Sequence, residues 1–151
     1  MNIKIRPATP EDLTTLKEFE QGLIDAERPF DTTIRKHPVQ YYDLEKLIPA
    51  ADCNVLIAIV DDEIVACGMV LIAIGRPYLN HSDYANIRFL YTKPEHRGRG
   101  INAMIIDQLI TWAHEQNLFE IRLTVYQNNI PAIKAYEKVG FKKHIIEMRL
   151  P

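Results

Sequence analysis

Hydrophobic and polar residues alternate along several short stretches of the chain, and this period of two predicts β-strands. Other short stretches are almost continuously apolar and lie between polar turns, which is typical of strands buried on both faces. The turn at residues 61–63 separates two such stretches and predicts a hairpin. The predicted strands span residues 3–6, 53–60, 64–74, 84–92, 119–125 and 141–150.

Elsewhere apolar residues recur every three or four positions, which predicts amphipathic helices. Thr9 and Pro10 are suited to begin the first helix, and Asn129 and Gly140 to flank the last. The predicted helices span residues 10–24, 41–48, 101–116 and 130–139. Residues 25–38 hold two prolines and several charges, so we expect a loop there. With the helix that follows, this loop is either one wall of a substrate site or a solvated connector.

This order of elements predicts a mixed α/β fold, with an antiparallel first half and a strand–helix–strand crossover in the second. A chain of 151 residues is long enough for one domain, and we expect residues 1–151 to form it. Cys53 and Cys67 lie in strand-like stretches without metal-ligand spacing, so we expect two reduced, buried thiols. No histidine cluster has metal-ligand spacing either, and we expect no metal.

The overall charge gives no reason to expect nucleic acid or membrane as a partner. The formal net charge is −2, so there is no broad attraction to polyanions. No apolar stretch approaches membrane-spanning length, and the first residues lack the apolar core of a signal peptide. We therefore expect a cytoplasmic protein.

Residues 94–102 carry the strongest chemical signal. Gly98 and Gly100 precede the third predicted helix, where a sharp turn can direct backbone N–H groups outward. The start of a helix adds unpaired N–H groups and partial positive charge, and Arg97 and Arg99 add full charges. A diphosphate site and a purely structural turn both fit this loop. The dinucleotide fingerprint does not, because it requires a third glycine where the chain has Ala103.

A second motif follows downstream and narrows the choice. Arg97-x-x-Gly100-x-Asn102 is followed by Asn129-x-x-Ala132-x-x-x-Tyr136-x-x-x-Gly140-Phe141. This pair of motifs, in this order, resembles the GNAT superfamily of N-acetyltransferases. The resemblance covers roughly residues 84–142. It implies a GNAT-like fold, with a mostly antiparallel twisted sheet of six to seven strands flanked by about four helices.

The resemblance also implies acetyl-CoA as the acyl donor. In this family a strand pairs with the pantetheine arm, the following loop holds the pyrophosphate, and the last helix contacts the arm and its sulfur. The cofactor-binding residues implied here are Leu90, Tyr91, Thr92, Arg97, Gly98, Arg99, Gly100, Ile101, Asn102, Asn129, Ala132 and Tyr136. Tyr136 is the implied catalytic acid that protonates the departing thiol, and backbone N–H groups at a strand bulge near Leu90–Tyr91 would polarise the carbonyl.

The chain departs from the family pattern at two places. Asn102 stands where the family prefers a glycine or alanine. Residues 84–89 contain no carboxylate, although many members carry a catalytic glutamate on this strand. An acceptor ammonium must lose a proton before it attacks. The candidates for that proton are Glu27, Asp31, His81, Asp83 or a water relay.

The acceptor is less well defined than the donor. If Arg88 faces the cleft, its guanidinium suits a carboxylate on the acceptor, and the alternative is an outward position on the sheet. The substrate-binding candidates are Glu27, Arg28, Asp31, Tyr42, Tyr78 and Arg88. We expect a small-molecule amine. A protein lysine or N-terminus, or a non-catalytic acyl-CoA sensor, are the alternatives, and the resemblance allows a homodimer.

Overall fold

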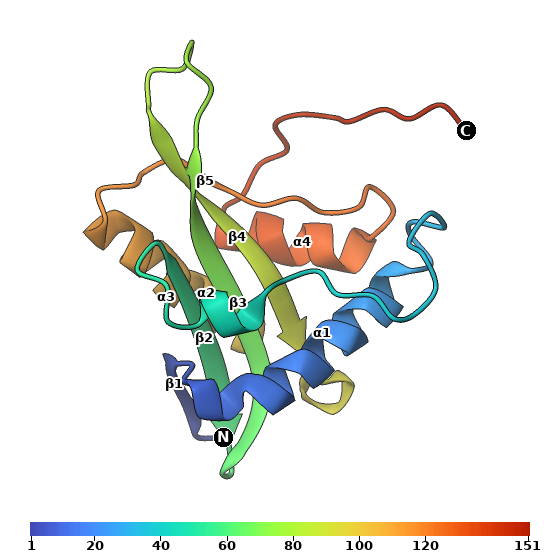
Figure 1. The fold of residues 1–151 in the computed structure, drawn as a ribbon, viewed down its shortest axis with the longest axis vertical. Coiled ribbons are helices and arrows are strands. Elements are labelled where there is room, and N and C mark those ends of the chain that lie inside the picture. Colours follow the sequence, from blue (N-terminus) through green and yellow to red (C-terminus); the bar gives the residue numbers. More distant parts are fainter.

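A single five-stranded sheet forms the centre of the protein, and helices cover both of its faces (Figure 1). The computed structural model describes all 151 residues. The strands are β1 (Ile3–Pro7), β2 (Cys53–Val60), β3 (Glu63–Ile74), β4 (Asp83–Thr92) and β5 (Ile121–Arg122). They lie in the sheet in chain order. The first four pair in antiparallel fashion, and β5 runs parallel to β4.

Four α-helices and two 3₁₀ turns surround the sheet. The helices are α1 (Leu13–Glu27), α2 (Leu44–Leu47), α3 (Ile101–Glu115) and α4 (Ile130–Val139), and the 3₁₀ turns span Pro10–Asp12 and Pro94–His96. One apolar core lies between α3 and the sheet, where Ile87 of β4 is buried. A second core lies on the opposite face under α1 and α2, where Phe89 is buried. The mixed α/β fold predicted from the sequence is confirmed.

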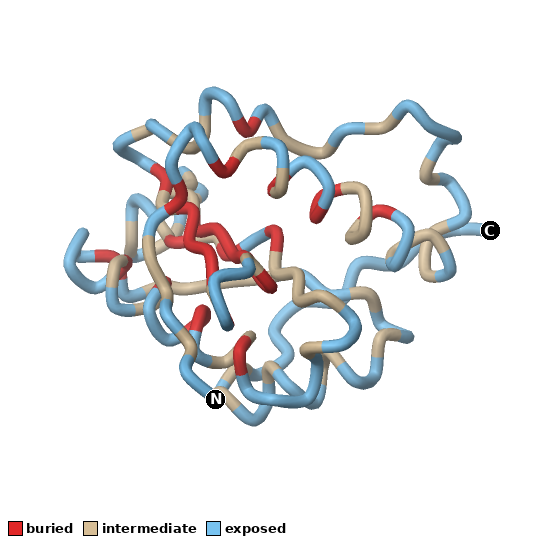
Figure 2. The backbone as a smooth tube through the Cα atoms, turned by 90° about the horizontal axis from the view of Figure 1, so that it is seen from below, coloured by how far each residue is buried: buried red, intermediate tan, exposed pale blue.

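Burial is concentrated in the first three quarters of the chain. Figure 2 marks the buried residues in red and shows exposed backbone at the C-terminus. No residue beyond Leu118 is buried. Both cysteines are buried and free of disulfides, as the sequence predicts, and burial raises the pKa of Cys53 to about 12. None of the helices is long and apolar enough to cross a membrane.

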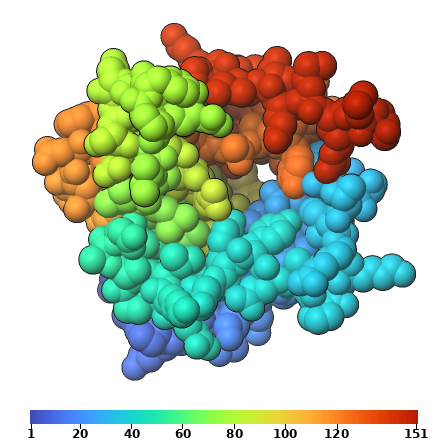
Figure 3. All heavy atoms as spheres, turned by 45° about the horizontal axis from the view of Figure 1, so that its top comes forward, coloured from blue at the N-terminus to red at the C-terminus, as the bar shows by residue number.

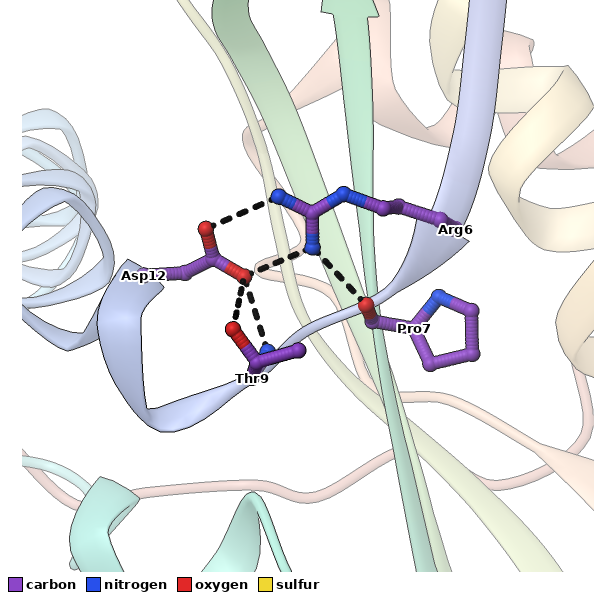
Figure 4. Close-up of polar contacts among 4 residues, drawn as sticks. All are labelled: Arg6, Pro7, Thr9 and Asp12. Atoms are coloured by element: carbon purple, nitrogen blue, oxygen red, sulfur yellow. Dashed lines mark hydrogen bonds and ion pairs between the residues drawn. The ribbon is translucent and has the colours of Figure 1, made fainter.

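An ion pair fixes the junction between β1 and the first helical turn (Figure 4). The Arg6 guanidinium donates to both carboxylate oxygens of Asp12, at 2.8 and 3.0 Å. The backbone N–H of Thr9 donates to the same carboxylate at 2.8 Å, which closes the turn at the predicted helix start. These bonds, with the Arg6 bond largest, lower the pKa of Asp12.

The prediction of six to seven strands is wrong, because the sheet has five. Residues 141–150 form no strand, although their sequence alternates. Ile145, Ile146 and Met148 of this segment are each more than three quarters exposed. Residues 119–125 form a strand only at Ile121–Arg122, where β5 pairs with Ala85 and Asn86 of β4. Alternation makes a strand possible, but a strand forms only beside a partner.

The predicted helix 41–48 is also shorter in the structure, where α2 spans only Leu44–Leu47. The buried carboxylate of Glu20 in α1 explains the difference. Its Oε2 accepts the backbone N–H groups of Tyr41 and Tyr42, at 3.1 and 2.8 Å. Both tyrosines are thereby held against α1, before the helix begins.

Candidate functional site

The sheet opens between β4 and β5, and this opening organises the candidate site. β4 has ten residues, but β5 pairs only with Ala85 and Asn86 near its start. From Ile87 to Thr92 the β5-facing edge of β4 therefore has no strand partner. Such an edge presents N–H and C=O groups to which an extended ligand can hydrogen-bond.

A β-bulge lies on this free part of β4. Met69 of β3 pairs with Arg88 and Cys67 pairs with Tyr91, so Gly68 faces both Phe89 and Leu90. Phe89 has a positive φ of 55°. The Cys67 thiol donates to the Phe89 carbonyl at 3.5 Å and lies beneath the bulge. The bulge predicted near Leu90–Tyr91 is thus present, at Phe89–Leu90.

The loop after β4 presents a row of uncommitted backbone donors. Gly98 and Gly100 have φ values of 76° and 79°, and a Cβ at either would contact nothing. Gly100 caps α3, whose first intrahelical bond runs from Met104 to Gly100. The N–H groups of residues 98–103 donate to no acceptor in the protein. Together with the positive end of α3, they form a site suited to an anion.

Arg97 and Arg99 add charge to this loop, and neither forms an ion pair there. Nε of Arg97 donates to the Thr92 carbonyl at 2.9 Å, and its guanidinium carbon lies 5.7 Å from the centre of the Tyr91 ring. Nη1 of Arg99 reaches only the Met1 sulfur, at 3.5 Å. Both side chains are exposed, so both positive charges are available to a ligand.

The second motif forms α4, as the sequence predicts. Asn129 caps this helix by accepting the Ala132 N–H at 3.4 Å, and Gly140 ends it with a φ of 124°. Tyr136 packs against the α3-side core, with its ring 6.4 Å from that of Phe141. Burial raises the pKa of Tyr136, and the negative charge of Glu27 raises it further. The phenol therefore stays protonated at neutral pH.

Glu27, the last residue of α1, lies on the other side of the opening. Burial raises the pKa of its carboxyl, and the nearby Tyr41 hydroxyl opposes that rise. Tyr42 packs against Phe89 beside the bulge, with ring centres 5.2 Å apart. Burial and the charge of Glu27 raise the pKa of Tyr42 to about 12, while the positive charge of Arg88 opposes this shift. Tyr42 thus lies within the fields of both charged groups.

Arg28 and Asp31 organise the loop that follows α1. Arg28 donates to the carbonyls of Ile34 and Arg35, at 3.3 and 3.0 Å, and so closes the loop on itself. Asp31 accepts both donors of Thr33 and also an Arg149 N–H at 3.2 Å. The C-terminal segment is thereby tied to this loop. These bonds, with those from Thr33 largest, lower the pKa of Asp31.

Figure 3 shows the resulting opening on the surface. The light-blue loop after α1, the orange residues that lead into α4 and the red C-terminal segment border it. Phe30 and Tyr126 face each other across these segments, with nearly parallel rings 6.0 Å apart. Arg88 is exposed on the α1 side of β4, and its guanidinium lies 3.1 Å from the side-chain amide of Asn86.

Other sequence-based candidates lie apart from this opening. Tyr78 is 77% exposed in the loop between β3 and β4, which projects at the top of Figure 1. His81 contacts Arg122, and Asp83 begins β4. At about 3.3 Å per residue, the start of β4 lies roughly 20 Å from Leu90. No group of three or more His, Cys, Asp or Glu side chains could hold a metal ion.

Sequence reasoning missed Tyr126 entirely. Tyr126 follows β5 in the loop before Asn129. A loop that leaves a strand beside a sheet opening is a common place for functional residues, and this was the available signal. Glu20 was also missed. Its role is visible only in the hydrogen bonds that hold Tyr41 and Tyr42.

A strand edge beside a sheet opening, followed by an anion-binding helix start, defines a class of protein that can hold an extended, phosphorylated cofactor. The family model "Acetyltransferase (GNAT) family" matches residues 20–141 of the chain. The chain therefore belongs to the GNAT family.

A streptothricin acetyltransferase is similar in sequence to part of this chain. The chain is 36% identical over 70 residues to a streptothricin acetyltransferase from Escherichia coli, and the match covers 45% of the chain and 40% of that protein. The matched region is thus less than half of that relative's length.

Two solved structures share the fold. One is a mutant of a Bacillus halodurans protein, with a TM-score of 0.88, 21% identity and coverage of 98% of each chain. The other is a predicted acetyltransferase from Clostridium acetobutylicum, solved with acetyl-CoA. It has a TM-score of 0.74 and 22% identity, and the match covers 99% of this chain and 96% of that one. At these identities the likeness extends to the fold alone.

Proposed function

We propose that the protein transfers an acetyl group from acetyl-CoA to the primary amine of a small molecule. The observation that carries this proposal is the divergence of β4 from β5, which leaves the Ile87 to Thr92 edge free immediately before the loop of uncommitted N–H groups. The acetyl-CoA complex of the Clostridium acetobutylicum protein, which shares the fold, supports the choice of donor.

The residues around the opening fit acetyl-CoA. The edge of β4 at Leu90 and Thr92 offers backbone groups to the amides of the pantetheine arm. The N–H groups of residues 98–103 would hold the pyrophosphate, and Arg97 and Arg99 would neutralise it. Asn102 has its side chain at the start of α3, where it can add a bond to the phosphates. Asn129 and Ala132, at the start of α4, would contact the arm.

Where the acetyl group is transferred, the residues of the site would stabilise the developing charge and move the protons. Acetyl-CoA, when bound, supplies an activated thioester, and the overall reaction converts R–NH₃⁺ to R–NH–CO–CH₃ with release of free thiol and one proton. Backbone N–H groups at the Phe89–Leu90 bulge would polarise the carbonyl. The Tyr136 hydroxyl, kept protonated by its raised pKa, would give its proton to the departing sulfur.

The acceptor side suits a molecule that carries both an amine and a carboxylate. Glu27 and Arg88 bring a negative and a positive charge within electrostatic reach of Tyr42, whose hydroxyl pKa the first raises and the second lowers. A guanidinium can clamp a carboxylate through two N–H donors. Glu27, Arg28, Asp31 and Tyr42 border the same region, and Tyr78 would contribute only to a larger acceptor.

A panel of acceptors tests this function directly. Free amino acids, polyamines, aminoglycosides and peptides are each incubated with the protein and acetyl-CoA, and free thiol is measured. We expect amine-dependent thiol release with at least one small-molecule class and weaker release with peptides. Release with peptides alone would favour a protein acceptor, and tight acetyl-CoA binding without any release would favour a sensor.

Replacement of Arg88 tests the acceptor's carboxylate. We expect Arg88→Ala to raise KM for carboxylated amines by about tenfold or more, because a charged hydrogen bond contributes roughly 1.5–3 kcal/mol. KM for amines without a carboxylate should stay unchanged. Arg76→Ala, an exposed arginine in the β3–β4 loop, is the matched control. Equal KM values across both kinds of acceptor would remove this role for Arg88.

A further inference from the structure

The charge of Glu27 acts on four tyrosines from three parts of the chain. Tyr41 and Tyr42 precede α2, Tyr126 precedes α4, and Tyr136 lies within α4. The pKa of each of these phenols is raised by burial first, and the charge of Glu27 raises each of them further. The carboxylate therefore lies within electrostatic reach of all four hydroxyls.

Glu27 is also the least committed carboxylate at the opening. It is half-buried and forms no ion pair. Burial raises its pKa, and the nearby Tyr41 hydroxyl only partly offsets that rise. Asp31, by contrast, is engaged by Thr33 and Arg149, and its pKa is lowered. A carboxylate with a raised pKa is the better proton acceptor of the two.

The remaining carboxylate and imidazole candidates are remote. Asp83 and His81 lie at the beginning of β4, and the bulge lies toward its end. Asp25 lies in the same helix as Glu27, but it is exposed and paired with His37 at 3.1 Å. Glu27 is therefore the one candidate that is half-buried, outside any ion pair and located at the end of α1, where the loop that borders the opening begins.

The other charged groups at the opening leave room for a cation. Arg88 lies on β4 with its guanidinium beside the Asn86 amide, and Arg149 is paired with Asp31. The rings of Phe30, Tyr41 and Tyr126 line the neighbouring segments. Aromatic faces and a carboxylate together are the chemistry that recognises an alkyl ammonium ion.

We propose that Glu27 binds the ammonium group of the acceptor and takes its proton. This inference rests on the proposed function. In the step, one N–H bond of R–NH₃⁺ breaks, its electron pair remains on nitrogen, and a carboxyl oxygen of Glu27 gains the proton. The products are R–NH₂ and the neutral Glu27 acid, which returns the proton to water through the opening. The ligand class is a primary alkyl amine.

A binding experiment tests the ammonium site without turnover. Butylammonium is titrated into protein whose glutamates carry ¹³C-labelled carboxyl groups, and the Glu27 resonance is followed by NMR. We expect this resonance to shift, and its titration midpoint to fall as the cation binds. Glu27→Gln should weaken butylammonium binding at least tenfold. Glu18→Gln, an exposed position on the same helix, should leave binding unchanged. An unmoved resonance, or equal binding by Glu27→Gln, would overturn the inference.

A kinetic experiment tests the proton transfer. With the best amine of the acceptor panel, Glu27→Gln should lower kcat/KM by roughly 10²–10⁴-fold at pH 7. The loss should shrink as pH rises toward the pKa of the amine, because more acceptor is then already neutral. An equal loss at every pH would indicate a structural role and overturn the proton transfer.

The two experiments also separate this inference from the proposed function. Thiol release that does not depend on Glu27 would refute the inference and leave the acetyltransferase proposal intact. Butylammonium binding at Glu27 without thiol release from any amine would refute the proposed function, and the proton transfer with it.

Discussion

At the scale of single residues, the most specific proposal is that Tyr136 donates a proton to the departing thiol. Its phenol is held near the α3-side core, and its raised pKa keeps a proton on the oxygen at neutral pH. We expect Tyr136→Phe to lower kcat by roughly 10²–10⁴-fold, because a general acid contributes a factor of that size. Steady-state kinetics with acetyl-CoA and the best acceptor would measure this.

The matched control for Tyr136→Phe is Tyr84→Phe, since Tyr84 contacts Arg122 near the start of β4. That change should leave kcat within about twofold of the unmodified protein, given that it touches none of the machinery at the opening. Unchanged turnover in Tyr136→Phe would remove the proton-donor role.

Asp12 gives a prediction about stability and pH. Its pKa is lowered by Arg6, so the ion pair adds stability above the pKa of an unfolded aspartate, about 3.9, and that contribution is lost as pH falls through the lower native pKa. We expect Asp12→Asn to reduce the free energy of unfolding by about 2 kcal/mol at pH 7. Below the native pKa the difference should approach zero.

Urea unfolding at a series of pH values measures this effect of Asp12. Glu11→Gln, an exposed neighbour in the same turn, is the control and should change stability by less than about 0.5 kcal/mol. A loss in Asp12→Asn that is constant from pH 7 to pH 2 would show that packing, and not the ion pair, is responsible.

At the scale of elements, the contact between α1 and β4 depends on a glycine. A Cβ at Gly22 would lie 2.6 Å from the Tyr91 hydroxyl and 2.8 Å from its ring carbon Cζ. Alanine favours an exposed helix by about 1 kcal/mol over glycine, but here the helix would have to move away from the strand. Tyr91 also packs against Phe19 of the same helix, with ring centres 5.1 Å apart and the rings tilted by 41°.

We therefore expect Gly22→Ala to destabilise the protein by about 1–3 kcal/mol, as overpacking does. Thermal unfolding followed by circular dichroism measures this change. The double variant Gly22→Ala, Tyr91→Phe removes the hydroxyl, the atom that the new Cβ would meet first, and should recover part of the loss. A stabilised Gly22→Ala variant would contradict the close contact.

The sequence predicts an element well where neighbouring residues determine its ends. It predicts an element poorly where a residue or strand that is distant in sequence determines them. Helices α3 and α4 were predicted nearly to the residue, because Gly100, Asn129 and Gly140 act locally at their ends. The strand predicted at 141–150 failed because its alternation has no neighbouring strand to pair with. The second helix was too long in the prediction because a carboxylate on α1, Glu20, captures two of its N–H groups.

The same distinction between contiguous residues and residues brought together by the fold applies to the candidate site. The donor loop was predictable because its glycines and helix start are contiguous in sequence. The acceptor side was not, because Glu27, Tyr126 and Arg149 meet only through the fold. Sequence alone left Glu27 among several possible bases. Burial, pairing and distance along β4 are what set it apart.

At the scale of the whole molecule, the sheet and its two cores support a site at one edge. Strands β2 to β4 and helix α3 contain most of the buried residues, α1 adds four more, and the donor loop follows directly after β4. The C-terminal segment adds little burial but reaches back to Asp31 through Arg149. The homodimer allowed by the family resemblance stays a prediction.

The most direct test of the whole account is calorimetric titration of coenzyme A into the wild type and into Gly100→Val. Valine cannot readily adopt the φ of 79° at Gly100, so the donor loop should distort while the fold remains. Asn117→Val imposes a similar strain at a φ of 62°, about 22 Å away at the other end of α3. The account predicts one-to-one binding by the wild type and Asn117→Val, and at least tenfold weaker binding by Gly100→Val. Equal affinity for all three proteins, or no binding by the wild type, would contradict it.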